Sequence, residues 1–226
     1  MTMPLLLARA DDVLRGRPWT LGADRPWGAV GPLAGIIVAF GMTYGAAMGS
    51  FGGLAGDRGL MVAYSALKVP LLLLATMALC LPSFFVVNSL MGVRDDFPEA
   101  IRALLATQAA LTIVLVSLAP VTLTWYASSA DYHGAILFNA AIFGVSSLGA
   151  QLVLRRAYRP LVARNPVHRR LLRAWLVLFA FVGTEMGWLL RPFIGNPDQP
   201  VQFFRDDAFG NAYLVVARMV WEKVAG

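Results

Sequence analysis

The residue in this sequence best suited to chemistry is Glu185, because it stands inside a long apolar run. An ionisable group within a membrane segment is costly, and it is kept where it has a partner or a task. Two cations are expected near its level: Lys68, and Arg191 at the end of its own run. A carboxylate paired with either cation is structural, whereas one facing a water-filled path can bind a proton or a cation. Both interpretations stay open.

Four uncharged amides also fall inside apolar runs. Hydrogen bonding between neighbouring transmembrane helices, worth about 0.6 kcal/mol on average, accounts for such residues without any pathway. If they line a cavity instead, they should face one another. These residues are Asn88, Gln108, Asn139 and Gln151.

The sequence contains few other residues that could form a catalytic, metal-binding or cofactor-binding site. His133 and His168 are predicted on opposite sides of the membrane, so they cannot form one catalytic or metal site. Cys80 is the single cysteine, which excludes an internal disulfide and a cysteine metal cluster. The sequence contains no phosphate-binding glycine loop, zinc-protease helix or nucleophilic serine elbow. We therefore expect no enzyme and predict no catalytic, cofactor-binding or metal-binding residue.

The composition identifies the solvent around these residues as lipid. Apolar residues make up 58% of the 226 residues and charged ones 14%, and the mean hydropathy is +0.64. Soluble domains are about 45–50% apolar and about 25% charged. We predict an all-α integral membrane bundle of five transmembrane helices, at about 31–50, 70–93, 103–126, 135–154 and 174–190.

This assignment divides the chain into three parts. Residues 1–30 form a cytoplasmic or interfacial segment, residues 31–190 the membrane domain, and residues 191–226 an extracytoplasmic loop and a C-terminal helix. Residues 3–16 and 209–224 have the amphipathic pattern of helices that lie in the headgroup plane. A frayed soluble tail is the alternative for the first of these.

Prolines shape the second and third spans. Residues 61–93 would form a helix of about 50 Å, longer than the hydrocarbon core of about 30 Å. We expect residues 61–69 to form an interfacial turn or helix, the span to begin near Pro70, and Pro82 to kink it. Acidic residues and Pro98 after Arg94 predict a tight turn into the third helix.

Small residues predict where helices pack. Glycines four residues apart lie on one helix face and let the backbones of two helices approach closely. This matters in lipid because no hydrophobic driving force brings membrane helices together there. We expect the first span to pack through its series, within the chain or against another chain. The series is Gly41, Gly45, Gly49 and Gly53, and a second pair is Gly183 and Gly187.

Lysine and arginine predict the orientation. With the N-terminus in the cytoplasm, the inner segments hold thirteen of these residues and the two outer loops one. The largest group is a basic patch that fits anionic lipid headgroups or an acidic partner, or simply directs insertion. It consists of Arg155, Arg156, Arg159, Arg164, Arg169, Arg170 and Arg173. The net charge of +6 thus indicates a membrane and no nucleic acid.

The amphipathic N-terminal segment, the Gly31, Pro32, Leu33 step and the five spans are similar in organisation to the Yip family of small membrane proteins. Ala66–Gly92 and Gly187–Arg205 resemble stretches of uncharacterised bacterial membrane proteins. Eukaryotic Yip proteins are linked to vesicle traffic and small GTPases, but the acidic N-terminal domain that they carry is not found here. The resemblance carries over no functional residue.

The sequence favours a non-enzymatic protein of a bacterial inner membrane, with the C-terminus outside. We expect it to act as a scaffold, assembly factor or accessory subunit. Its helices carry faces of small residues suited to helix packing, and the sequence contains no group of residues suited to catalysis. Its expected partners are lipids and other membrane subunits or a second copy. The alternative is a small transporter or channel with a proton- or cation-coupled site at Glu185.

Overall fold

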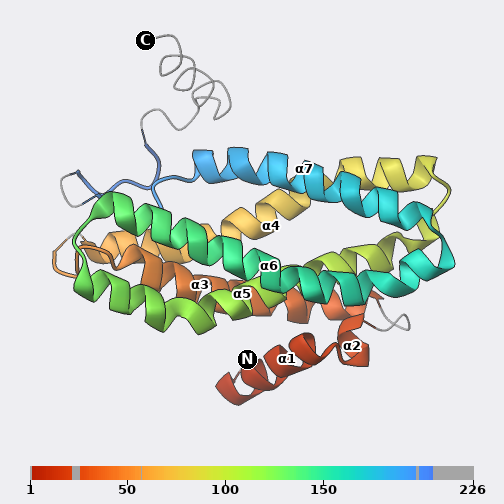
Figure 1. Ribbon diagram of the computed structural model, residues 1–226, viewed down its shortest axis with the longest axis horizontal. Coiled ribbons are helices and arrows are strands. Elements are labelled where there is room, and N and C mark those ends of the chain that lie inside the picture. The colour runs from red at the N-terminus through yellow and green to blue at the C-terminus, as the bar shows by residue number, and fades with distance from the viewer. Residues whose placement is uncertain (1, 22–25, 57, 197–198, 206–226) are drawn as a thin grey trace, which may run out of the picture.

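The computed structural model describes residues 2–21, 26–56, 58–196 and 199–205. The described part is mostly helical and contains no strand. Five helices are long and apolar enough to cross a membrane, and they run lengthwise beside one another (Figure 1). The predicted all-α membrane bundle is therefore confirmed. The helices are α3 (Val30–Gly49), α4 (Arg58–Leu90), α5 (Phe97–Ser128), α6 (Tyr132–Arg164) and α7 (Val167–Leu189).

Short helices precede and connect these five. α1 (Met3–Arg15) and α2 (Pro18–Leu21) come first, η1 (Pro26–Ala29) leads into α3, and η2 (Arg94–Asp96) leads into α5. α1 is the expected amphipathic helix: Ala10 and Val13 pack into the core, while Leu5 and Leu7 stay exposed. The amphipathic helix predicted at 209–224 lies outside the described residues.

Residues 61–69 take the helical form of the two expected for them, as part of α4. The helix continues through Pro70 and Pro82 without a break. Val69 and Pro70 are buried, and α3 packs on this stretch with Gly41 against Pro70. Neighbouring helices make proline tolerable inside a membrane helix, which is why tertiary packing outweighs the missing hydrogen bond here.

Residues 155–173, which lie between the predicted fourth and fifth spans, are not the loop that those two spans imply. α6 continues to Arg164, and α7 begins at Val167, so only Asn165 and Pro166 lie between them. The buried face of α6 carries on through Leu154, Tyr158 and Leu161. Because this periodic face packs on the bundle, the arginines between its members sit on a helix.

The turn into α5 has the predicted form. Pro98 stands in the first turn of α5, where it has no hydrogen bond to lose. Glu99 is in the same turn, near the positive end of the helix dipole.

The glycines of α3 lie against α4. A Cβ at Gly45 would come 2.3 Å from the carbonyl oxygen of Ser65, and one at Gly49 would come 2.8 Å from that of Met61. Gly53 departs from the series: it follows the end of α3, has a φ of +99°, and has nothing within 4 Å of its Cβ position.

The second predicted glycine pair, Gly183 and Gly187 on α7, makes looser contacts. The Cβ position of Gly183 lies 3.6 Å from the Thr76 methyl, an ordinary contact with α4. That of Gly187 meets nothing within 4 Å. Close packing through glycine is therefore a property of α3 and α4, and α7 rests on α4 less tightly.

The bundle has two distinct ends (Figure 1). At the arginine end, residues 91–96 join α4 to α5, and residues 165–166 join α6 to α7. At the other end lie the α3–α4 and α5–α6 connections and a strap, which we define as residues 190–196 and 199–205. The arginines of α6 and the short 129–131 connection are thus at opposite ends, as the predicted topology requires.

Candidate functional site

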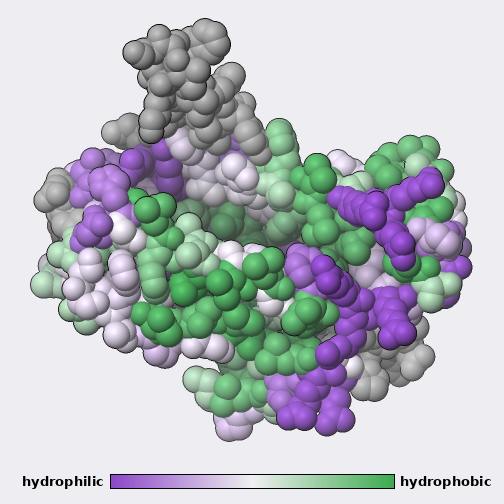
Figure 2. Space-filling model, in the orientation of Figure 1, coloured by the Kyte–Doolittle hydropathy of each residue, from purple (hydrophilic) through white to green (hydrophobic). Residues whose placement is uncertain are grey.

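α7 stands apart from α6. It packs mainly on α4 and has little contact with α6 beyond the turn that joins them. Figure 2 shows the result as a hollow of hydrophobic residues between α6 and α7. Two cavities occupy this region, one towards the arginine end and one beside the strap. We call them the Gln108 cavity and the strap cavity.

The Gln108 cavity has a volume of about 440 Å³ and walls from α4, α5, α6 and α7. Two facing walls carry small side chains, Ser147 and Ala150 on α6 and Ala180 and Gly183 on α7. Small residues on both sides of an open membrane groove leave room for the backbone of another helix.

Gln108 gives this cavity its polar character. Its side chain is 6% exposed, and its Nε2 donates to the Met77 sulfur at 3.3 Å. Its Oε1 has no hydrogen-bond partner among the described residues. Gln151 lines the same cavity, so two of the four predicted amides meet here. A buried acceptor without a donor costs about 1–3 kcal/mol, and a donor entering the cavity would remove that cost.

The other two amides, Asn139 and Asn88, make hydrogen bonds within the bundle. The Asn139 Oδ1 accepts from the Tyr44 hydroxyl at 2.9 Å, while its Nδ2 donates to the Tyr126 hydroxyl at 2.7 Å and to the Ala135 carbonyl at 2.8 Å. This residue joins α3, α5 and α6. Asn88 donates to the Phe84 carbonyl of its own helix at 2.7 Å.

The strap is held by polar side chains of α4. The Lys68 ammonium is fully buried, donates to the Pro192 carbonyl at 2.7 Å and stands 4.7 Å from the centroid of the Phe203 ring. Ser65 donates to the Phe193 carbonyl. Lys68 therefore binds the backbone of the strap and does not serve as the partner considered for Glu185.

The strap cavity lies beside these contacts and has a volume of about 510 Å³. Its lining is mainly apolar, with Met48 of α3, Leu72 of α4 and Phe143 of α6. Two guanidinium groups also line it: that of Arg191 stands 3.4 Å from the Trp188 ring centroid, and that of Arg205 is 3.4 Å from the Tyr132 hydroxyl. Within the described part of the chain, the two charged groups of this lining are thus both cationic.

Glu185 lines neither cavity, although its neighbour Thr184 lines the first and Trp188 the second. It is half-buried on α7. The two cavities thus do not extend to the carboxylate on which the transporter alternative depends.

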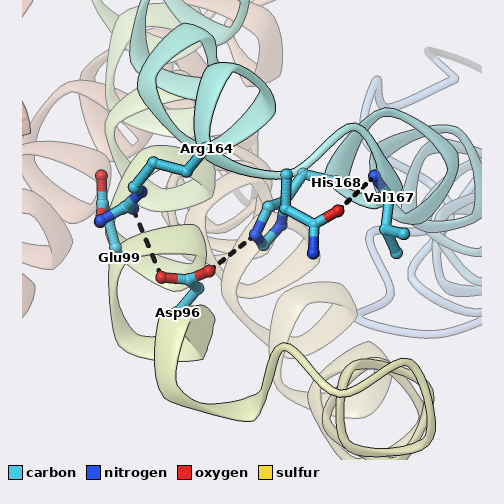
Figure 3. A network of polar contacts seen from close by, with 6 residues as sticks. Asp96, Glu99, Arg164, Val167 and His168 are labelled. Atoms are coloured by element: carbon cyan, nitrogen blue, oxygen red, sulfur yellow. Dashed lines mark hydrogen bonds and ion pairs between the residues drawn. The ribbon is translucent and has the colours of Figure 1, made fainter.

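A polar network closes the arginine end (Figure 3). Arg164 pairs with Glu99 and lies 3.4 Å from Asp96, and the other oxygen of Asp96 is 2.9 Å from Nε2 of the buried His168. These bonds tie the start of α5 to the α6–α7 turn. Sequence reasoning missed this network, although acidic residues in one turn and basic ones beside Pro166 were the available signal.

The predicted basic patch therefore consists of two groups: arginines that bond to other parts of the bundle, and arginines that are exposed. Arg164 is engaged in this network, and Arg156 donates to the Leu14 carbonyl of α1 at 3.1 Å. The remaining predicted members are exposed on the flanks of α6 and α7; they are Arg155, Arg159, Arg169, Arg170 and Arg173.

Among the described residues, no group of three or more His, Cys, Asp or Glu side chains is placed to hold a metal ion. No protein-family model matches the chain, and no curated protein or solved structure does so either. The likeness to the Yip family therefore stays a prediction. This chain is a multi-pass α-helical membrane protein with two cavities between its last helices.

Proposed function

We propose that this chain is a non-enzymatic accessory or assembly subunit of a membrane complex, and that it binds one transmembrane helix of another protein in the Gln108 cavity. We place it in a bacterial inner membrane with its arginine end at the cytoplasm, because the helix ends and connections on that side carry the arginine excess.

The observation that carries this proposal is the unsatisfied Oε1 of Gln108 in a cavity with small-residue walls. A helix bearing Ser, Thr or Asn would supply the missing donor, and Ala150, Ala180 and Gly183 would let it approach. A lipid acyl chain has no donor and gains nothing from small side chains. The chemistry of the cavity thus favours a polypeptide.

The transporter alternative receives less support. It needs a water-filled path to Glu185, and that residue lines neither cavity. Exchange of a proton or a cation across vesicles holding the protein, abolished by Glu185→Gln, would favour transport over helix docking.

Site-specific photo-crosslinking in native membranes tests the docking proposal. Ala180 and Val177 are one turn apart on α7 and both exposed, but only Ala180 lines the cavity. A crosslinker at 180 should give one protein adduct of defined mass, and one at 177 should give none. An adduct with twice the mass of the chain would identify a second copy instead. Equal or absent protein adducts at the two positions would contradict the proposal.

A further inference from the structure

We propose that the strap cavity binds an anionic phospholipid, with an acyl chain inside the cavity and the phosphate at Arg191 and Arg205. This site is separate from the Gln108 cavity, and it needs no partner protein. Its ligand is a component of the bilayer itself.

The shape of the cavity fits a hydrocarbon chain. It holds about 510 Å³ between four of the long helices and the strap, and apolar side chains such as Leu72, Ile136 and Phe143 dominate its lining. Ile136 and Ala140 of its lining are exposed on α6, so the cavity can be reached from the side of the bundle. A chain entering from the bilayer would stay in an apolar environment throughout.

The charge of the lining selects the headgroup. Arg191 and Arg205 are both cationic, and none of the described residues that line the cavity is acidic. Stacking on Trp188 orients the plane of the Arg191 guanidinium, and a guanidinium presents a fork of N–H donors that matches a phosphate. A zwitterionic headgroup would bring its own positive charge, a third cation, towards these two arginines.

The depth of the arginines agrees with a headgroup contact. Trp188 and Tyr132 stand beside them at the strap end, and Trp and Tyr are enriched where the hydrocarbon core meets the headgroups. Lys68 and Ser65 hold the Pro192 and Phe193 carbonyls, and both of these strap residues line the cavity. The cavity wall and its two cations are therefore fixed at one level.

Lipid binding to the purified full-length chain in detergent tests this site. Native mass spectrometry would compare phosphatidylglycerol with phosphatidylcholine of the same acyl chains, and with oleate. We expect about tenfold tighter binding of phosphatidylglycerol than of phosphatidylcholine, since a charged hydrogen bond is worth about that factor. Oleate should bind more weakly than phosphatidylglycerol.

Two variants and a control locate the binding. Arg205→Gln should lower phosphatidylglycerol binding about tenfold, to the level of phosphatidylcholine. Ala140→Trp should reduce the binding of both lipids by filling the cavity, whereas Arg94→Gln, an exposed change at the arginine end outside the basic patch, should leave binding as it is. Equal binding of the two lipids, an equal loss in Arg94→Gln, or stronger binding of oleate would each overturn the proposal.

Discussion

The ammonium nitrogen of Lys68 lies 2.7 Å from the carbonyl oxygen of Pro192, so a buried cation of α4 holds the backbone of the strap. The two residues are 124 positions apart in the sequence. This contact and its neighbour from Ser65 to Phe193 make the strap a wall of the cavity beside it.

Replacing Lys68 by Met should loosen the strap more than it destabilises the bundle. The Pro192 carbonyl loses its donor, but the cost of burying a cation is removed at the same time. We expect the free energy of unfolding to change by less than about 1 kcal/mol, while amide exchange in residues 191–196 and 199–205 speeds up. Hydrogen–deuterium exchange measures this, with the exposed neighbour Leu67→Met as control. Unchanged exchange in the strap would show that Lys68 does not hold it.

Gly45→Ala should separate α3 from α4. The new methyl group would lie 2.3 Å from the Ser65 carbonyl oxygen, a backbone atom that cannot turn aside. We expect a loss of about 1–3 kcal/mol of stability, the range for overpacking, in unfolding titrations with a denaturing detergent. Gly144→Ala on α6 is the matched control, because its Cβ position has nothing within 4 Å. Similar stabilities for the two variants would refute close packing at Gly45.

Asn139 and Tyr44 should be energetically coupled. The Tyr44 hydroxyl donates to the Asn139 Oδ1 at 2.9 Å inside the bundle. A double-mutant cycle with Asn139→Leu and Tyr44→Phe should give a coupling energy of about 0.6–1.7 kcal/mol, the range for hydrogen bonds between membrane helices. Additive losses in the same unfolding titration would mean that the two side chains act independently.

Arg164→Gln should weaken the junction of α5 with the α6–α7 turn. It removes the bonds to Glu99 and Asp96 and leaves two acidic groups close together. Because Arg164 is half-exposed, we expect a loss of only about 1 kcal/mol, smaller at high salt. Arg159→Gln, an exposed change on the same helix, should have little effect. A loss that does not respond to salt would point to packing of the side chain instead.

The sequence predicted the positions of the long helices well wherever the helix coincides with a long run of apolar residues. It failed to predict the C-terminal end of α6 and the start of α7. In α6, arginines stand between the members of a buried face formed by Leu154, Tyr158 and Leu161, so the sequence there contains no long apolar run. It left open whether residues 61–69 form a turn or a helix, because the packing of α3 on α4 at Pro70 is a tertiary contact.

The candidate site was only partly predictable. Gln108 and Gln151 stand out in the sequence as polar residues in apolar spans, but their shared cavity depends on how far α7 stands from α6. The contacts of Lys68 with Pro192 and of Asp96 with His168 join residues far apart in the chain. Pairings of this kind follow from tertiary packing and carry no local signal.

Docking of a partner helix at Gln108 predicts opposite effects of one substitution on the chain and on its complex. Gln108→Leu removes the buried acceptor without a donor, so the isolated chain should be at least as stable as before. Its complex should be weaker, because the hydrogen bond to the partner is lost. Unfolding titrations of the isolated chain and recovery of the complex would measure the two effects. Equal recovery of the complex with and without this change would contradict a role for Gln108 in docking.

The most direct test is the mass of the particle extracted from native membranes in gentle detergent, compared between Ala180→Trp and Val177→Trp. Both changes add the same side chain to an exposed position of α7, but only the first fills the Gln108 cavity. We predict a complex with another chain for the wild type and for Val177→Trp, and the chain alone for Ala180→Trp. A complex that survives in Ala180→Trp, or a wild-type chain that is monomeric at every concentration, would contradict helix docking as its function.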